Sequence, residues 1–358
     1  MNIIIYEDNK IQNFKPFSLN HAMFELQCGL VSNLERVKHW YKSDGHKIIL
    51  LVRSEIEDLI RYRYPDMLVN PQNIPAGKYI NGRYILNQKF DLNMFPDSPH
   101  DINSDIDNLI KPNFIWDLLS LTKMQIIDDW NFLNFQNESS NNCYIGDNAI
   151  IKDGVILDSS NGPIIIDDNA IIDIGALLQG PIYISKNSYI APGAKIRKGT
   201  IIGENCKIGG EVSNTIFNSN SNKAHDGFMG DSFIGQWVNV GAGTNNSNLK
   251  NNYSYIRFSF NGVNDIDTNL QFLGSMIGDY TRIGISTMLN TGTYIGLGAN
   301  VFGPGFQNKH IPSFSWGRDG VKTDFEKFIS TCGKMYVRRS RKLSDIEIDF
   351  LSFLYNQK

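Results

Sequence analysis

Large aliphatic residues recur every six positions through the second half of the chain, and this period constrains the fold more than any other feature. The longest run comprises Ile166, Ile172, Leu178, Ile184, Ile190, Ile196, Ile202 and Ile208. A helix repeats every 3.6 residues and an alternating strand every two, so neither explains a period of six. A prism wound from short strands does explain it, because each six-residue segment supplies one face and one inward aliphatic residue.

Two stretches break this period. Residues 213–233 and about 246–276 lack the regularly spaced aliphatic residues. A prism has no structural need for either stretch, and long insertions in a rigid solenoid usually form functional loops. The sequence therefore predicts two functional loops, of which the first contains His225 and the second follows residues 239–248.

Glycine is distributed unevenly, and this divides the chain. Only four of the 31 glycines precede residue 141, whereas 26 lie between Gly146 and Gly320. At roughly 150 residues per domain, a length of 358 residues suggests two domains. We expect an α/β domain at residues 1–140, the prism at residues 143–317 and a helical segment at residues 318–358.

The first half alternates apolar runs with helix signals. Residues 2–6 and 47–52 are typical of buried strands, and Ser32-x-x-Glu35 and Ser54-x-x-Glu57 are capping boxes that open helices. This order implies an α/β layer with parallel strands. The sequence further predicts a hairpin with a type I′ turn at residues 79–84 and helices at residues 115–121, 123–132, 323–337 and 344–355.

Charge and cysteine usage exclude several classes of protein. The net charge of −3 gives no electrostatic reason to expect nucleic acid or an acidic membrane as a partner. The four cysteines are far apart and form no CxxC pair, so we expect neither a metal site nor disulfides. No signal peptide is apparent, and no run reaches the roughly 18 apolar residues of a membrane helix. We therefore expect a cytoplasmic protein.

His225 is the strongest candidate for a catalytic group. Among six histidines, it alone combines a predicted loop with small and polar neighbours. Acyl transfer from a thioester needs a base with a pKa near neutrality and a donor for the oxyanion that develops. His225 suits the first role, and a backbone N–H or a carboxamide suits the second.

The residues around His225 resemble those of a known family. His225-x-x-Phe228-x-Gly230-Asp231, Asn239–Thr244 and Asn248 are similar to the acetyltransferase half of the GlmU-like bifunctional N-acetylglucosamine-1-phosphate uridyltransferases/glucosamine-1-phosphate acetyltransferases. Residues 209–214, 221–227 and 311–317 resemble a group of shorter sugar nucleotidyltransferase-like proteins related to that family. The resemblance implies a degenerate nucleotidyltransferase-like α/β domain, a left-handed parallel β-helix of hexapeptide repeats and C-terminal helices. It also implies a homotrimer in which acetyl-CoA and a sugar meet between neighbouring prisms.

Roles follow by position from this resemblance. His225 would be the general base, and Asn248 would orient it or the acceptor. The sugar substrate would contact Glu211, Lys223, Phe228, Asn239 and Lys250. Acetyl-CoA would contact Ala242, Ser286 and Gly303. A nucleotide would contact Asp8, Lys10 and Lys15, with Mg²⁺ needed only if the first domain is active. The asparagines equally fit corner or ladder positions of the prism.

Departures from the family leave the function open. Ala191 and Ser213 stand where the family has an Arg and a Lys for the sugar phosphate, a ligand that needs charge-assisted donors. No glycine-rich loop follows residues 2–6. Three hypotheses remain: an acetyl-CoA-dependent acyltransferase acting on an amino sugar, sugar phosphate or nucleotide sugar; a sugar-1-phosphate nucleotidyltransferase; and a non-catalytic sugar-nucleotide-binding scaffold.

Overall fold

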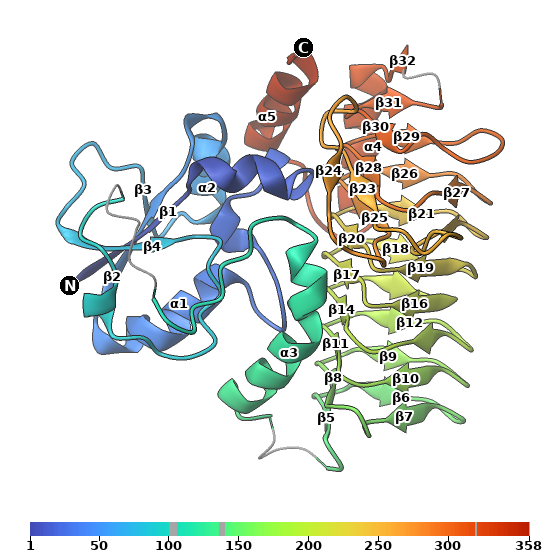
Figure 1. The fold of residues 1–358 in the computed structure, drawn as a ribbon, viewed down its shortest axis with the longest axis horizontal. Coiled ribbons are helices and arrows are strands. Elements are labelled where there is room, and N and C mark those ends of the chain that lie inside the picture. The colour runs from blue at the N-terminus through green and yellow to red at the C-terminus, as the bar shows by residue number, and fades with distance from the viewer. Residues whose placement is uncertain (100–105, 136–139, 319–320, 358) are drawn as a thin grey trace.

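The computed structural model describes residues 1–99, 106–135, 140–318 and 321–357. A small α/β layer at the N-terminal end lies beside a long prism of stacked short strands (Figure 1). Two helices, α4 (Phe325–Val337) and α5 (Asp345–Asn356), follow the prism. The arrangement confirms the predicted fold class, an α/β part followed by a hexapeptide β-helix and C-terminal helices.

Four parallel strands form the N-terminal sheet in the order β3-β2-β1-β4. Their bounds are β1 (Asn2–Tyr6), β2 (Lys47–Leu51), β3 (Leu68–Val69) and β4 (Gly77–Asn81). Helix α1 (Asn33–Tyr41) begins at Ser32, whose hydroxyl accepts a hydrogen bond from the Glu35 backbone N–H. Helix α2 (Glu57–Arg63) ends before Pro65. The predicted α/β layer with parallel strands is therefore confirmed.

Short 3₁₀ helices connect these elements: η1 (Asn9–Phe14), η2 (Phe17–Leu19), η3 (Met23–Glu25), η4 (Lys42–Asp44), η5 (Ser54–Ile56) and η6 (Leu92–Met94). The two helices predicted at residues 115–121 and 123–132 are a single helix, α3 (Asp117–Phe132). The helix continues through Thr122 because its buried residues, Leu119, Thr122 and Ile126 among them, recur at helical spacing across that position.

The hairpin predicted at residues 79–84 is wrong. A turn does form, since the Tyr84 backbone N–H donates to the Asn81 carbonyl at 3.0 Å. The strand before the turn, β4, however, pairs in parallel with β1, and Ile85 beyond the turn forms a bridge with Ile110 instead. Pairing with the buried β1 decides the direction of β4, and no short-range turn signal carries that information.

The prism has three faces built from parallel strands. The first face comprises β5 (Cys143–Ile145), β8 (Ile164–Ile166), β11 (Ile182–Ile184), β14 (Thr200–Ile202), β17 (Ile216–Phe217), β20 (Phe233–Ile234), β25 (Ser275–Ile277), β28 (Thr293–Ile295) and β30 (His310–Ile311). The second face comprises β6 (Ile150–Ile151), β9 (Ile171–Ile172), β12 (Tyr189–Ile190), β15 (Lys207–Ile208), β18 (Asn222–Lys223), β21 (Asn239–Val240), β26 (Arg282–Ile283), β29 (Asn300–Val301) and β31 (Ser315–Trp316). The last of these pairs antiparallel with β32 (Val321–Lys322).

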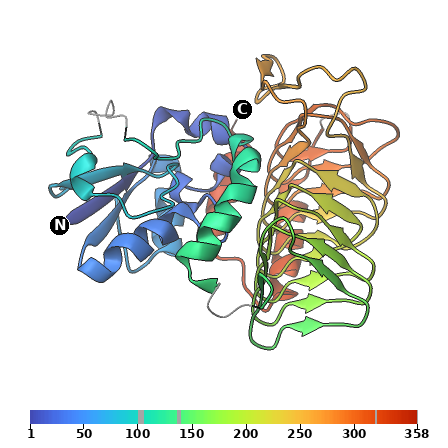
Figure 2. The same ribbon diagram turned by 60° about the horizontal axis from the view of Figure 1, so that its bottom comes forward.

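The third face comprises β7 (Ile156–Asp158), β10 (Leu177–Gln179), β13 (Lys195–Ile196), β16 (Glu211–Ser213) and β19 (Phe228–Gly230). It continues with the pair β22 (Asn245–Asn246) and β27 (Met288–Leu289). The stacked coils and their flat faces are visible in Figure 2.

The inward side chains of the three faces form one apolar column. On the first face Ile166, Ile184 and Ile202 stack in register, and all three are completely buried. Each is separated from the next by three six-residue segments, one for each face. The column also contains Ile172, Leu178, Ile190, Ile196, Ile208, Ile277, Ile283, Leu289, Ile295 and Val301. The interpretation of the six-residue period as a prism is confirmed.

Residues 213–233 are not an inserted loop, and that prediction was wrong. They contain β17, β18 and β19, which pair in register with the neighbouring coils. The period is hidden because the inward positions hold Phe217, Lys223 and Met229 in place of Ile, Leu or Val. A search for Ile, Leu and Val at every sixth position therefore misses a coil that is structurally regular.

The second interruption does contain an insertion. Between β22 and β25 the chain leaves the prism and forms an antiparallel hairpin of β23 (Arg257–Phe258) and β24 (Ile266–Asp267). Leu249 and Phe272 form a bridge at its base. The excursion leaves from the corner between the third and first faces.

The N-terminal part packs on the first face, with α3 between its sheet and the prism (Figures 1 and 2). Outward side chains of this face form one apolar cluster with the N-terminal part; they are Ile165, Tyr183, Ile201, Ile216, Phe233, Met276 and Tyr294. The cluster is joined from the other side by Phe14, Phe17, Trp116, Leu119 and Ile126. Burial of this many apolar side chains makes the two parts one continuous core.

Helix α4 packs on the corner between the first and second faces. Its Phe328, Cys332 and Tyr336 lie in a cluster with Trp237 and Tyr280 of the prism. Helix α5 contacts α2 and adds Phe350 to the core of the N-terminal part. The third face receives neither helix. Among the described residues, no helix is long and apolar enough to span a membrane.

A buried ion pair between the two parts makes stability depend on pH. The His21 Nε2 atom lies 2.8 Å from Asp279 Oδ2. Burial and the nearby Arg63 oppose the charge on His21, but the charge of Asp279 and the hydrogen bonds to Asp279 and Glu25 together outweigh them, so the pKa of His21 is raised above its usual 6.5. We expect the stabilisation to be full below pH 6.5 and to be lost as the pH rises through the raised value.

Thermal unfolding at a series of pH values checks this expectation. The melting temperature of the wild type should fall as the pH rises above about 6.5, and Asp279→Asn should be less stable with a flatter profile. Identical pH profiles for the two proteins would contradict the assignment.

Candidate functional site

His225 lies on the corner between the second and third faces. We call it the His225 corner; it comprises residues 191–194, 209–210, 224–227, 241–244 and 284–287. Backbone hydrogen bonds join its successive coils: the Gly243 N–H donates to the Asp226 carbonyl at 2.9 Å, and the Ser286 N–H donates to the Ala242 carbonyl at 2.7 Å. The structure therefore brings His225, Ala242 and Ser286 onto one edge of the prism.

The His225 side chain is exposed. Among the described residues, none makes a hydrogen bond to its imidazole, whereas its backbone carbonyl accepts one from Lys223 at 2.9 Å. An accessible imidazole held by its own main chain is free to exchange a proton with a ligand.

The coils beyond His225 offer small residues and one apolar side chain. Ala242 is followed on the next coil by Ser286, which is exposed and has a φ of 53°. Ile285 beside it is 77% exposed. Gly303, one coil further, is also exposed, and a Cβ there would meet only the Arg318 Cβ at 3.8 Å. Ile285, Ser286 and Gly303 are thus exposed along one edge of the prism.

Lys223 differs from its predicted role. Its side chain points into the prism, is 1% exposed and donates to the Gly209 and His225 carbonyls at 3.0 and 2.9 Å. Burial lowers its pKa to about 8. This geometry speaks against a direct contact between the Lys223 amine and a sugar.

Glu211 and Phe228 are outward neighbours on the third face, in register on β16 and β19. The Glu211 carboxylate pairs with Arg197 at 3.0 Å, and the Phe228 backbone N–H donates to Asn245 Oδ1 at 2.7 Å. The two predicted substrate-binding residues are therefore adjacent and lie next to the His225 corner. Arg197 is a cation at this place that the sequence analysis did not identify, because nothing in the spacing links it to Glu211.

Asn248 lies on the opposite edge of the third face. Its amide donates to Asp231 Oδ2 at 2.6 Å, and Asn214 donates to Asp231 Oδ1 at 2.7 Å. The width of the third face, crossed here by the three-residue strand β19, separates this edge from the His225 corner. Within one copy of the chain, Asn248 is therefore held by Asp231, which the sequence analysis quoted in its motif without assigning it a role.

Two further predicted sugar contacts lie elsewhere. Asn239 is exposed on the second face, where it is in register with Asn222 and Arg282. Lys250 lies at the start of the insertion, and its amine donates to the Tyr255 carbonyl at 2.6 Å. Asn239 thus lies on the second face two residues before the His225 corner, whereas Lys250 lies beyond the opposite edge of the third face.

The residues predicted to contact a nucleotide are engaged in internal contacts. Asp8 follows β1, and its carboxylate pairs with Arg83 at 2.9 Å and accepts from Asn81 at 2.7 Å. The Lys10 amine donates to Asn113 at 2.7 Å. Lys15 is half-buried, and burial together with nearby Arg53 lowers its pKa.

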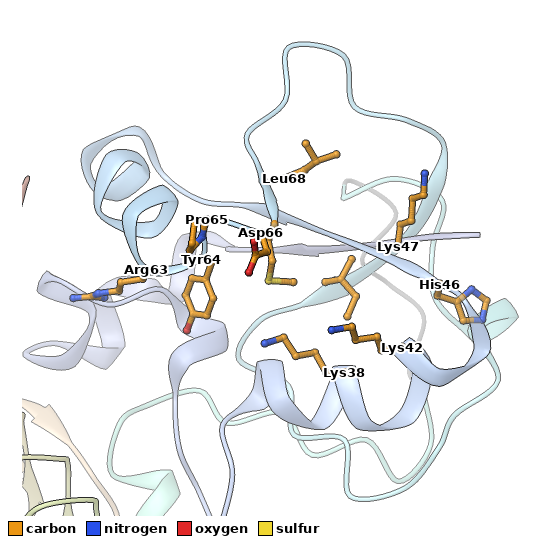
Figure 3. A pocket seen from close by; sticks show the side chains of 11 residues that line it. Lys38, Lys42, His46, Lys47, Arg63, Tyr64, Pro65, Asp66 and Leu68 are labelled. Atoms are coloured by element: carbon orange, nitrogen blue, oxygen red, sulfur yellow. The ribbon is translucent and has the colours of Figure 1, made fainter.

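A cavity of about 400 Å³ lies elsewhere in the N-terminal part, between α1 and the segment that leads from α2 to β3 (Figure 3). Lys38, Lys42 and Lys47 line it. Lys47 begins β2, so the cavity lies toward the amino end of this strand. Ligands of open α/β sheets bind outside the carboxyl ends of the strands, and this cavity therefore has a different position from a usual nucleotide site.

Metal-binding side chains do not gather in the part of the chain that the structure describes. No group of three or more His, Cys, Asp or Glu residues there could hold a metal ion. Cys28, Cys143, Cys206 and Cys332 are all free thiols.

Known families match both parts of the chain. A model of the sugar nucleotidyl transferase family matches residues 3–95, and a model of the bacterial transferase hexapeptide (six repeats) matches residues 181–213. The chain is 30% identical over 194 residues to the bifunctional protein GlmU of Synechococcus elongatus, over 52% of this chain and 35% of that protein. These matches confirm the resemblance to the GlmU-like family.

An archaeal protein is similar to a comparable degree. The bifunctional sugar-1-phosphate nucleotidylyltransferase/acetyltransferase of Sulfurisphaera tokodaii is 31% identical over 191 residues, which cover 52% of this chain and 47% of that protein. The chain thus spans less than half the length of either relative. The solved structure of the polysialic acid O-acetyltransferase OatWY aligns with 49% of this chain and 82% of that chain at 13% identity, with a TM-score of only 0.19.

The contacts of Asp8 predict that it stabilises the N-terminal part. The Asp8–Arg83 pair is almost completely buried, and removing one partner of such a pair costs about 3–5 kcal/mol. Asp8→Ala should therefore lower the free energy of unfolding in urea by about that amount.

Asp91→Ala is a matched control for Asp8→Ala. Both carboxylates cap a short 3₁₀ helix by accepting a backbone N–H two residues on, at 3.0 Å for Asp8 and 2.9 Å for Asp91. Loss of a cap alone costs about 1 kcal/mol. Equal losses in the two variants would show that the ion pair does not stabilise the fold.

Proposed function

We propose that this chain is an acyltransferase that moves the acetyl group of acetyl-CoA to an amino or hydroxyl group of a sugar, with His225 as general base. The observation that carries the proposal is the exposed imidazole of His225 on a corner whose next coils offer Ala242, Ser286 and the exposed Ile285. A base and a strip for the thioester arm thus lie on the same edge of the prism.

The reaction follows from this placement. The His225 imidazole takes the proton of the acceptor amine or hydroxyl as its nitrogen or oxygen attacks the thioester carbonyl. When the tetrahedral intermediate collapses, the carbon–sulfur bond breaks, and the imidazolium returns the proton to the leaving thiolate. Acetyl-CoA and acceptor become acetylated acceptor and CoA thiol. The Ser286 hydroxyl, exposed on the next coils, is a candidate donor to the developing oxyanion.

Acceptor binding is assigned to the third face next to the corner. The Phe228 ring can cover the apolar face of a sugar, and the Glu211 carboxylate can accept hydrogen bonds from its hydroxyl or ammonium groups. The nearest cation, Arg197, already pairs with Glu211. With Ala191 and Ser213 in the positions of the family's phosphate-binding cations, these contacts favour an amino sugar or a nucleotide sugar over a sugar monophosphate.

A homotrimer would complete this site. The N-terminal part covers the first face and α4 packs on the corner beside the second, whereas the third face exposes Ile156, Leu177 and Met288. A neighbouring copy packed there would bring its own polar side chains toward His225, whereas this copy's Asn248 is held by Asp231 on the opposite edge of the third face.

Nucleotidyl transfer is the second candidate function, favoured by the family match at residues 3–95. It needs carboxylates for Mg²⁺, and the two carboxylates that directly follow β1 are already paired, Glu7 with Arg53 and Asp8 with Arg83. We therefore expect the N-terminal part to bind the sugar or nucleotide portion of an acceptor without catalysing pyrophosphate release.

A thiol-release assay tests the acyltransferase proposal. The protein is incubated with acetyl-CoA and a panel of amino sugars, their phosphates and nucleotide-linked forms. At least one acceptor should give turnover that His225→Ala reduces by about 10²-fold or more, the usual contribution of a general base. His39→Ala, on α1 far from the corner, should keep full activity.

Other results would overturn this proposal. Turnover that is unchanged in His225→Ala would exclude His225 as the general base. If no acetyl transfer occurs but the protein releases pyrophosphate from a nucleoside triphosphate and a sugar 1-phosphate in the presence of Mg²⁺, the nucleotidyltransferase would be favoured. Binding of nucleotide sugars without any turnover would favour a scaffold.

The oligomeric state is a separate prediction. Light scattering after size-exclusion chromatography should give three times the mass of the chain. Leu177→Lys, which places a charge on the exposed third face, should dissociate the trimer. Leu68→Lys changes a similarly exposed leucine on the edge strand β3 and should leave the trimer intact. A monomeric wild type would contradict the proposed assembly.

A further inference from the structure

Lys223 occupies a position in the prism where its neighbours in register are aliphatic. Its partner on the preceding coil of the second face is Ile208, which in turn pairs with Ile190. Both isoleucines are completely buried, and Lys223 is 1% exposed. The Lys223 amine thus lies in the apolar column, at a position that neighbouring coils of this face fill with Ile or Val.

A shortened corner makes room for this amine. From the second to the third face, the chain advances six residues between Ile190 and Ile196 but only four between Ile208 and Val212, which are their partners on the next coil. The coil that contains Lys223 again needs six residues to reach Met229. The coil directly before the one that carries His225 therefore turns at Gly209–Gly210 with two residues fewer than its neighbours.

The amine replaces a hydrogen bond that the short corner lacks. In several corners that advance six residues, the backbone N–H of the fourth corner residue donates to the carbonyl of the first, as Ala194 does to Ala191 at 3.2 Å and Thr244 does to Gly241 at 3.3 Å. Gly209 occupies the same corner place, and its carbonyl accepts from the Lys223 amine at 3.0 Å. Gly210 leaves the space free, since a Cβ there would lie 2.8 Å from the Lys223 Nζ atom.

The same amine also contacts the main chain of His225 at the His225 corner. It donates to the His225 carbonyl at 2.9 Å and to the Gly209 carbonyl at 3.0 Å. One buried group therefore links the His225 main chain to the preceding coil through hydrogen bonds. Burying an amine is unfavourable, and the lowered pKa of about 8 reflects this, although Asp226 offsets part of it. Residues that break a local packing rule in this way are concentrated at functional sites.

We propose that Lys223 is a positioning residue, which sets the His225 imidazole at the corner by bridging the Gly209 and His225 carbonyls from inside the prism. The proposal rests on the proposed function of His225. It differs from the substrate contact implied by the family resemblance, because the amine faces the column and the backbone and not the outer face.

Lys223→Met tests this role, with Ile208→Met as the matched control. Methionine has a similar length without a donor, and Ile208→Met places the same residue in the same column one coil earlier. In Lys223→Met, amide hydrogen exchange at residues 225–228 should accelerate at least tenfold, while exchange at residues 190–196 stays unchanged. In Ile208→Met, both segments should exchange as in the wild type.

Turnover gives the second readout. Lys223→Met should lower kcat at least tenfold and change the KM for acetyl-CoA less than threefold, since Ala242 and Ser286 are untouched. Faster exchange at the corner with an unchanged kcat would overturn the positioning role and leave a purely structural one. Unchanged exchange would overturn the bridge itself. Because exchange does not need a substrate, this test remains decisive even if the wild type has no acetyltransferase activity.

Discussion

The register between successive coils is the constraint on which the rest of the structure depends. Each strand pairs in parallel with the equivalent strand one coil away, so every inward position meets the same position above and below. A coil can change its side chains or shorten a corner only if the register of the faces is kept. The Gly209–Gly210 corner shows this: two residues are missing, the faces remain aligned, and a lysine amine supplies the missing donor.

The elements that cover the first face and the corner beside the second limit where the candidate site can lie on the prism. The N-terminal part and α3 bury the outward residues of the first face, and α4 packs on the corner beside the second. The third face and the His225 corner stay accessible, and they carry His225, Glu211 and Phe228. The N-terminal part thus has a clear structural effect: it covers the first face and leaves the third face free for the ligands and the second copy of the chain that we propose.

The six-residue period predicted the fold of the prism more accurately than it predicted where functional loops leave it. Regular aliphatic spacing identified the prism, and the capping boxes at Ser32 and Ser344 identified the starts of α1 and α5. The same spacing misled at residues 213–233, because Phe217 and Lys223 fill inward positions where the pattern expects Ile, Leu or Val. The hairpin at residues 79–84 failed for a related reason, since pairing with β1 acts over a long sequence distance.

What the sequence by itself determined is the set of local periods and the chemistry of the corner: six-residue repeats, helix caps and one histidine among small residues. Tertiary structure alone decided which way each side chain points and what it meets. It turned Lys223 inward onto two carbonyls, paired Asp8 with Arg83, and placed Asn248 beside Asp231, on the opposite edge of the third face from His225. The physical reason is that these contacts join different coils or strands, and their geometry depends on register and corner length, which no single segment of sequence encodes.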